Sequence, residues 1–437
     1  MKRHSLSALV AAGLLAGGLA TGANAADLGG NCCADLEERI AELEATTARK
    51  GNRKVSLTIS GWVGEQVLIW DDGVESNAYV TGLGATLNSH FKMTGQATIA
   101  PGYQAGYVIH VETATSDPFA VNQATDDATV FPSVSLLQSY WFINSDRMGK
   151  LSVGQQSHAS DNTAILVDGS GSLVPANWLI IEGGAFATRS AGALNGFVWG
   201  DVLNCGHTTA GIAADCNGLP LNSVRYDSPT FGGFSVSATW GEDDFWDVAA
   251  RYAGEFNGVK VAIAAAFSHT SDEGVFLQRN IAIGVDRRDS NYFQIGAFVH
   301  HVPTGLFFYG AYGNENNDNL SIDPAGDGAG GELSPDTDHF YLKAGLRRKF
   351  VPLGHTVMYG EYARYNDMQS PVLNDLNDGA GSSEVNRWGL GVVQEIDAAA
   401  MSLWLTYRHI EGDITGPNVN LDLDELHMIK AGALINF

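Results

Sequence analysis

From Val55 to the last residue, polar and apolar side chains alternate with a period of two, and this pattern constrains the fold more than any other feature. In the segment 259–268, valine, isoleucine and phenylalanine alternate with lysine, alanine and serine. An Asn-Gly pair at 257–258, a typical two-residue hairpin turn, joins this segment to a similar one at 246–256. Because successive side chains of a strand point to opposite faces, the pattern predicts a series of antiparallel strands.

The connections between these segments alternate between short and long. Short turns are predicted near 100–102, 144–149, 228–233, 257–258, 302–305, 351–354 and 396–400. Long segments are predicted near 71–84, 113–134, 157–220, 242–245, 269–290, 314–337, 367–383 and 412–423. Seven short and eight long connections imply sixteen strands, with residues 276–286 assigned to a loop because an even number requires it. Short connections at one end and long ones at the other are typical of transmembrane barrels.

The composition favours a barrel over a soluble secreted protein. Charged residues are only 17% of the chain, below the roughly 25% usual for soluble domains, and aromatic residues are 10%. No segment after residue 25 approaches 18 uninterrupted apolar residues, which a membrane-spanning helix requires. We therefore expect an all-β fold, a sixteen-stranded antiparallel transmembrane β-barrel over 55–437. Its last strand ends on Phe437, and such an aromatic terminal strand resembles the signal read by the outer-membrane insertion machinery.

Residues 1–25 resemble a signal peptide. Lys2 and Arg3 precede an apolar run, and Ala23-Asn24-Ala25 fits the small-x-small cleavage rule. Cleavage after Ala25 would leave 412 residues (437 minus 25), and an uncleaved anchor helix is the alternative. Loss of the two basic residues would change the net charge from −24 to −26. So acidic a chain is not expected to bind nucleic acid.

Residues 26–54 differ from the rest and predict a short N-terminal helix. The segment 35–48 is rich in Glu and Ala and contains neither Gly nor Pro. Leu36, Ile40 and Leu43 have the spacing of a coiled-coil seam about two heptads long. A lone solvated helix remains the alternative, because so short a seam is marginal by itself.

The sequence contains no motif for catalysis or for binding a cofactor or metal. Gly169 to Ser172 lacks the pattern of a nucleophile elbow, and no Gly-rich phosphate-binding motif with Lys occurs. The acidic segment 314–337 could supply oxygen ligands to Ca²⁺, but it does not match an EF-hand, which favours a solvated loop. Cys205 and Cys216 flank a Gly- and Ala-rich stretch and predict a disulfide within the long segment 157–220.

Several segments resemble the Gram-negative general porins. Gly149 to Gln155 (GKLSVGQ) is similar to the strand before the constriction loop of that family. Asn222 to Pro229 (NSVRYDSP), followed by FGGF at 231–234, is similar to its next strand, turn and strand. The resemblance implies an outer-membrane porin, a homotrimer among outer-membrane lipid and lipopolysaccharide, which lets small hydrophilic solutes and ions diffuse passively through a water-filled pore.

The segment before the barrel carries two further resemblances. Residues 35–54 look like the periplasmic helix of some alphaproteobacterial porins. Ala26-Asp27, at the expected new N-terminus, resembles the start of barrel proteins whose α-amine is joined to peptidoglycan. The alternative is that Ala-Asp is merely common after a cleavage site.

The resemblance also implies that the segment 157–220 folds into the barrel as a constriction loop. Its candidate pore-facing acids are Asp161, Asp168 and Glu182. The alternation predicts a set of basic residues on the inner wall, namely Lys92, Arg225, Arg251, Lys343, Arg347, Arg387, Arg408 and Lys430. Acids on the loop opposite bases on the wall would create a transverse field that selects by pore diameter and charge. The alternative is that each base pairs with a neighbouring carboxylate.

Two other functions stay open, and an enzyme is not expected. A substrate-specific channel would need an aromatic path through the lumen, and Trp178 and Trp404 are too few to argue for one. A structural tether between outer membrane and cell wall is suggested by the helical prefix. An outer-membrane enzyme would need convergent groups in a pocket, and the sequence indicates none.

Overall fold

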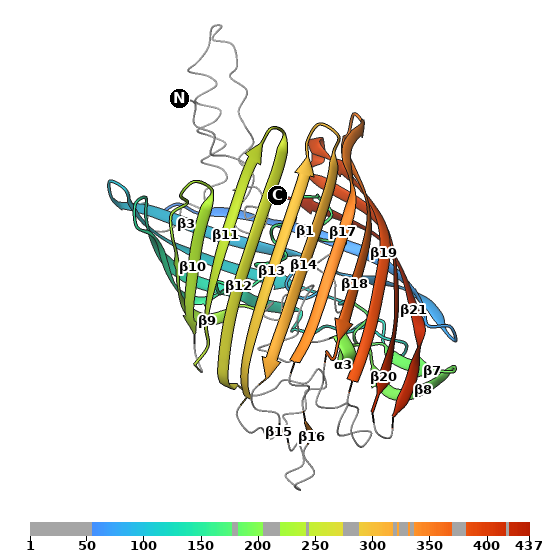
Figure 1. Cartoon of the computed structure of the whole chain (residues 1–437). Coiled ribbons are helices and arrows are strands. Elements are labelled where there is room, and N and C mark those ends of the chain that lie inside the picture. Colours follow the sequence, from blue (N-terminus) through green and yellow to red (C-terminus); the bar gives the residue numbers. More distant parts are fainter. Residues whose placement is uncertain are drawn as a thin grey trace.

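The alternating segments form the strands of one β-sheet, shown in the computed structural model of Figure 1. The structure describes residues 55–176, 182–203, 219–241, 244–273, 288–317, 321–322, 331–332, 336–368, 382–416 and 419–437. The strands of the wall are β1 (Thr58–Asp71), β2 (Ser76–Thr81), β3 (His90–Ala100), β4 (Tyr103–Thr113), β5 (Val134–Ser145), β6 (Gly149–Gln156), β9 (Leu221–Asp227), β10 (Phe234–Gly241), β11 (Trp246–Phe256), β12 (Val259–Glu273), β13 (Arg288–His301), β14 (Leu306–Asn317), β17 (Asp336–Val351), β18 (Gly354–Asn366), β19 (Ser382–Ile396), β20 (Met401–Thr415) and β21 (Asn420–Asn436). The connections contain the hairpins β7 (Ala187–Ser190) with β8 (Ala193–Val198) and β15 (Ser321–Ile322) with β16 (Gly331–Glu332), and the helical turns α3 (Gly200–Leu203) and η1 (Asp397–Ala399).

The seventeen strands of this sheet occupy sixteen places in the wall. The first half of β1 pairs with β3, from Thr58 opposite Thr94 to Trp62 opposite His90. Its second half pairs with β2. Because β2 and β3 lie on the same side of β1, they are two parts of one wall position, and seventeen strands minus one gives sixteen. The predicted sixteen-stranded antiparallel barrel is confirmed.

The sheet closes on itself between its first and last strands. β1 pairs with β21 from Trp62 opposite Asn436 to Asp71 opposite His427. Gly61 and Phe437 then exchange two backbone hydrogen bonds, of 3.1 and 3.0 Å. Closure matters because no water inside a bilayer is available to pair with the N–H and C=O groups of a free edge.

The seven short turns lie at one end of the barrel, and the strand ends that flank the long connections lie at the other (Figure 1). All seven predicted short turns are present between the strands that they were expected to join. The predicted long segment 71–84 is wrong: residues 72–75 form a tight turn, and residues 82–89 then leave the wall and fold inward. The predicted segments 269–290 and 412–423 were too long, since backbone pairing continues to Glu273 and to Thr415.

The polarity of the barrel is the reverse of that of a soluble protein. Large apolar side chains such as Ile263, Phe308 and Leu405 are exposed on the outer face. Gln294 and Lys343, which lie on the inward register, are buried. This is the alternation expected of a wall that faces lipid outside and a polar interior inside.

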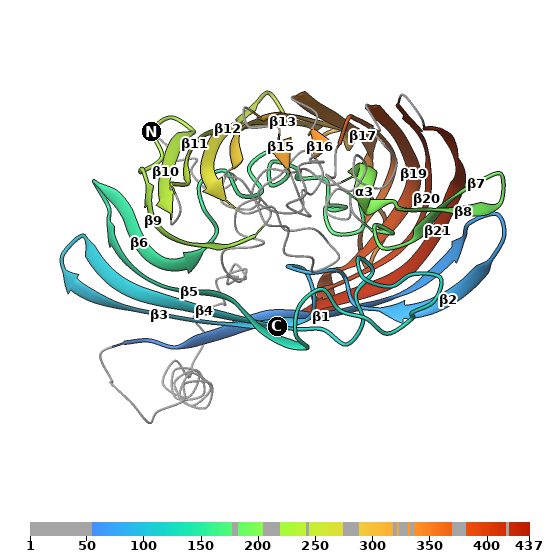
Figure 2. The same ribbon diagram turned by 90° about the horizontal axis from the view of Figure 1, so that it is seen from below.

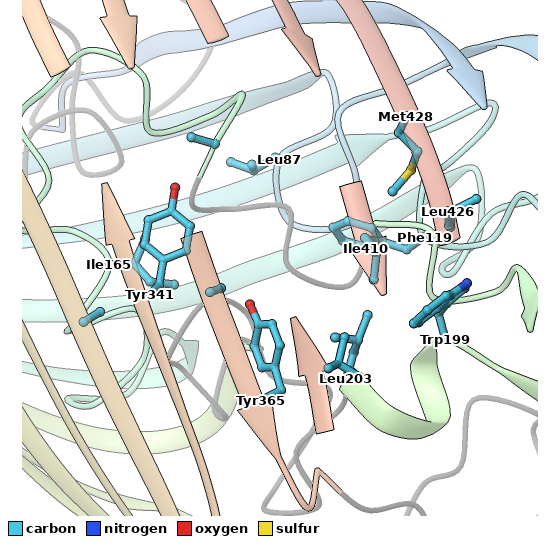
Figure 3. Close-up of a cluster of buried hydrophobic side chains, with 14 of the residues drawn as sticks. Leu87, Phe119, Ile165, Trp199, Leu203, Tyr341, Tyr365, Ile410, Leu426 and Met428 are labelled. Atoms are coloured by element: carbon cyan, nitrogen blue, oxygen red, sulfur yellow. The ribbon is translucent and has the colours of Figure 1, made fainter. Parts of the chain in front are cut away.

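The packed core lies inside the barrel, where inward side chains meet the internal segments 82–89, 114–133, 157–176 and 182–203. Trp62 illustrates the contact, since its indole Nε1 donates a hydrogen bond of 3.0 Å to the carbonyl of Leu87. Figure 3 shows part of this cluster, with Leu87, Phe119, Ile165, Trp199, Leu203, Tyr341, Tyr365, Ile410, Leu426 and Met428 labelled. Apolar packing therefore fixes three connections against the inner wall.

A charge placed at mid-height on the outer face should oppose folding. Leu390 lies in the middle of β19 and is 59% exposed on that face. Leu390→Arg should destabilise the folded barrel by about 2–4 kcal/mol, because a cation at the bilayer midplane is costly. Ser382→Arg, at the exposed end of the same face, is the control and should cost at most about 1 kcal/mol. Urea-driven unfolding from lipid vesicles measures the free energy of unfolding of both variants. Equal destabilisation by the two substitutions would contradict the placement of Leu390 at the middle of the lipid-facing surface.

Candidate functional site: the inner wall and the segment between β6 and β9

Between β6 and β9, residues 158–176 and α3 lie inside the ring of strands, as Figure 2 shows for α3, and the β7–β8 hairpin lies at its rim. Nearly all of residues 158–172 are buried. The segment contacts the wall strands in the order β11, β13, β14, β17, β20 and β21, and it is fixed by hydrogen bonds and ion pairs at each step.

The first attachment is to β11. Asp247 accepts hydrogen bonds from the backbone N–H and the hydroxyl of Ser160, at 2.6 and 2.7 Å, and lies 2.7 Å from His158 Nδ1. Arg251, also on β11, donates to the carbonyl of Ala159 and to the hydroxyl of Thr163. The start of the segment is thereby held against the wall by one buried acid and one base.

The second attachment depends on a glycine in β13. Ala164 donates its N–H to Gln294 Oε1 over 2.8 Å, and its carbonyl accepts a hydrogen bond from the Tyr309 hydroxyl. A Cβ atom at Gly296 would lie only 2.0 Å from the same carbonyl oxygen. The backbone of the segment can approach the wall this closely only because residue 296 has no side chain.

The third attachment is an ion pair between buried groups. Lys343 Nζ on β17 donates to the Asp168 carboxylate over 2.5 Å and to the Ser172 hydroxyl over 2.9 Å. The ammonium also lies 5.7 Å from the ring centre of Tyr309 and 5.5 Å from that of Tyr359. Two aromatic faces and a carboxylate together replace the water that a lysine would lose on burial.

The fourth attachment joins three wall strands through Glu182. Its carboxylate accepts from Arg408 on β20 and from Lys430 on β21, each at 2.8 Å. Arg408 also donates to Glu361 on β18, which in turn accepts a hydrogen bond from Tyr341. Lys430 donates further to the carbonyl of Pro175, and Arg408 to that of Ala176.

The last attachment brings the β7–β8 hairpin to the far side of the ring. Arg189 donates to Asp72 at 2.8 Å and to Glu75 at 3.1 Å in the turn after β1. The Asp424 carboxylate of β21 accepts the backbone N–H groups of Ala191 and Gly192. The segment is thus tied to strands around half of the inner wall.

All eight predicted wall bases lie on the inward register of their strands, the face opposite the exposed apolar side chains. Five of them form ion pairs within the described residues: Arg225, Lys343, Arg347, Arg408 and Lys430. Of the other three, Lys92 lies opposite His110 in the sheet, Arg251 bonds to the segment, and Arg387 lies 5.8 Å from the ring centre of Tyr341. That these eight groups line the path of the solutes stays a prediction.

The three predicted acids lie in the internal segment and are buried. Asp168 and Glu182 contact wall bases directly. Asp161 accepts a hydrogen bond of 2.6 Å from the Asn162 side chain, and its burial raises the pKa of the carboxyl. Direct pairing means that Asp168 and Glu182 attach the segment to the wall as well as carrying charge.

Sequence reasoning missed the inward acids Glu361 and Asp247 and the aromatic groups around them. Glu361 lies in the run MYGEYARY, where tyrosines at 359 and 365 share its face at a period of two. A lone acid among inward tyrosines is the signal that could have identified it. The predicted seam (Leu36, Ile40, Leu43), the predicted disulfide (Cys205, Cys216) and Trp178 lie outside the described residues.

Comparison with known proteins identifies the family. Residues 6–415 match the model of the Gram-negative porins. The chain belongs to the Gram-negative porin family. It is an outer-membrane β-barrel that forms a diffusion pore and is not an enzyme. No helix among the described residues is long and apolar enough to cross a membrane.

Solved structures with low sequence identity share this fold. The anion-selective porin from Comamonas acidovorans is 15% identical, with a TM-score of 0.54 over 88% of this chain and 100% of that one. OmpF of Salmonella typhi, solved with daunomycin, is 13% identical, with a TM-score of 0.51 over 89% and 99%. The outer-membrane channel DcaP of Acinetobacter baumannii is 10% identical, with a TM-score of 0.50 over 90% and 100%. No curated protein sequence matches the chain.

Removing the Glu182 charge should loosen the end of the internal segment. Glu182→Gln leaves two buried cations with one partner fewer, and breaking such pairs costs on the order of 3–5 kcal/mol. Amide hydrogen exchange in residues 182–203 should therefore become at least about tenfold faster. Glu384→Gln, which removes a pair with Arg364 on the outer face, is the matched control. Unchanged exchange in the Glu182 variant would show that other contacts hold the segment.

Proposed function

We propose that this porin is a general diffusion channel for small hydrophilic solutes with a weak preference for cations. The observation that carries the proposal is a cavity of about 550 Å³ at the end of the barrel with the long connections. Five carboxylates line it, from Glu411, Asp413, Asp422, Asp424 and Glu425. Four of these carboxylates, of Glu411, Asp413, Asp422 and Glu425, are on the outward register of β20 and β21, so the cavity lies on the outer rim of that end. A negative rim raises the local concentration of cations beside the mouth of the channel.

The inner wall supports the same conclusion. Five of the eight inward bases are already paired with carboxylates, so their positive charge is largely neutralised at short range. The whole chain has a net charge of −24. Selection then depends on the diameter of the channel and on the unbalanced acids, without a dedicated binding site.

The ion preference is measured as a reversal potential in a KCl gradient across a planar bilayer. The wild type should favour K⁺ weakly at low salt, and the preference should decline as salt screens the acids. Asp413→Asn with Asp422→Asn removes two carboxylates that lie opposite each other in the β20–β21 pairing and should reduce the preference. A clear preference for Cl⁻ in the wild type would mean that the wall bases dominate.

We propose further that the protein is a trimer of the alphaproteobacterial type whose N-terminal segment lies in the periplasm. Leu36, Ile40 and Leu43 would form a three-stranded coil below the barrels. Leu36→Asp with Ile40→Asp should lower the share of trimer on native gels and leave the barrel folded. Leu36→Ile with Ile40→Leu keeps the seam apolar and serves as the control. A wild type that migrates only as monomer in mild detergent would refute the trimer.

The tether to the cell wall is the second candidate function. An α-amine at Ala26 has a pKa near 7.7–8.0 in model peptides and is partly neutral, hence nucleophilic, at neutral pH. The helix would extend the reach of that amine by about 1.5 Å per residue. Lysozyme digestion of purified cell walls should release an Ala26 peptide that carries a muropeptide. Recovery of only the free N-terminal peptide would leave the protein a porin without a tether.

A further inference from the structure

Two histidines face each other on the outer surface of the barrel, near its acidic end. His409 on β20 lies directly opposite His427 on β21 in the antiparallel pairing. Both are on the outward register, together with the exposed Leu405 and Ile429. His409 is nevertheless only 5% exposed, because the rings of Trp388 and His427 pack against it with centroids 5.3 and 5.0 Å away.

The ring nitrogens of the two histidines form an ordered set. The two Nδ1 atoms lie 3.3 Å apart, and the hydroxyl of Tyr407 lies 2.8 Å from Nδ1 of His427. Each Nε2 atom faces a carboxylate, that of His409 at 3.3 Å from Glu411 and that of His427 at 3.2 Å from Glu425.

While both imidazole rings are neutral, the donors and acceptors of this set cannot all be paired in hydrogen bonds. A neutral imidazole has one N–H donor and one acceptor nitrogen, and an ionised carboxylate only accepts. Nε2 must therefore carry the hydrogen in both His409 and His427, which leaves two lone pairs facing each other at Nδ1. The Tyr407 hydroxyl has a single hydrogen and can satisfy one of them. A positive centre between the two Nδ1 atoms removes the conflict.

We propose that His409 and His427 bind a divalent transition-metal ion, of the class of Zn²⁺, between their Nδ1 atoms. Two nitrogens that bind one Zn²⁺ at about 2.0–2.1 Å with tetrahedral geometry lie about 3.3–3.4 Å apart, and the observed separation is 3.3 Å. Glu411 and Glu425 accept the Nε2 hydrogens, which fixes the tautomer of each ligand. With the lone pair of His427 Nδ1 engaged by the ion, the Tyr407 hydroxyl, 2.8 Å from that nitrogen, can offer its oxygen as a third donor.

The surroundings of the pair suit a metal ion that arrives from solution. Glu425, whose carboxylate lies 3.2 Å from Nε2 of His427, keeps a negative charge close to both rings, since one atom of each of these three side chains lies within 4.8 Å of the others. His427 also lines the acidic cavity at the end of the barrel, where nearby carboxylates concentrate cations. Imidazole ligands select zinc, copper and nickel over the harder Ca²⁺ and Mg²⁺. The ion would join the last two strands next to the bulge between Ile410 and Gly412.

Isothermal titration of the purified, chelator-treated protein without a polyhistidine tag tests the site. ZnCl₂ should bind at one ion per chain, and His409→Asn and His427→Asn should each weaken binding at least about tenfold. His269→Asn is the matched control, since the ring of His269 also packs beside a tryptophan of the outer face, Trp246, with centroids 5.7 Å apart, but His269 lies opposite Asn291. It should bind Zn²⁺ like the wild type.

Two further measurements separate the site from a loss of folding and from the acidic groups. Heat-dependent gel mobility should show that all variants are folded barrels, and electron paramagnetic resonance with Cu²⁺ should show two coupled nitrogens in the wild type and one in each asparagine variant. Absence of Zn²⁺ binding in the wild type would overturn the proposal. So would binding that both asparagine variants retain, or equal binding of Ca²⁺, because each would assign the ion to the carboxylates alone.

Discussion

A bilayer offers no water to unpaired backbone groups, and the rest of this structure depends on how the chain meets that constraint. The pairing of β1 with β21 closes the sheet and leaves no free edge in the wall. Once the ring is closed, each strand has one face toward lipid and one toward the interior. The period-two pattern of the sequence follows from this geometry, since a shift of one residue would exchange the two faces.

A closed ring of sixteen strands encloses more space than the inward side chains fill, and in this chain the segment between β6 and β9 occupies part of it. Apolar contacts such as those of Ile165 and Trp199 provide packing. The ion pairs of Asp168 and Glu182 contribute position more than net stability, because burying both charges offsets much of their attraction. Forming such a pair gains little net free energy, but losing one partner leaves a buried unpaired charge at a high cost. The segment is therefore held at one place on the wall.

The sequence predicted what depends on local pattern. Strand number, the seven short turns and the inward register of the eight bases all follow from alternation between polar and apolar residues. It could not predict which groups meet across the interior: Lys343 and Asp168 are 175 positions apart, and Arg408 and Glu182 are 226 apart. The sequence did not predict that one wall position is divided into β2 and β3. The reason is similar, since residues 82–89 turn inward to contact Trp62 and Glu112. The His409–His427 pair is invisible until the register of β20 and β21 is known.

The central proposal is that the internal segment, held by ion pairs to Lys343, Arg408 and Lys430, narrows the channel. Single-channel conductance in planar bilayers tests it most directly. The account predicts discrete conductance steps for the wild type that grow with KCl concentration, and larger steps for Asp168→Asn combined with Glu182→Gln, which release the segment from the wall. A wild type without conductance would contradict the channel. A double variant with unchanged conductance would contradict the claim that these pairs set its width.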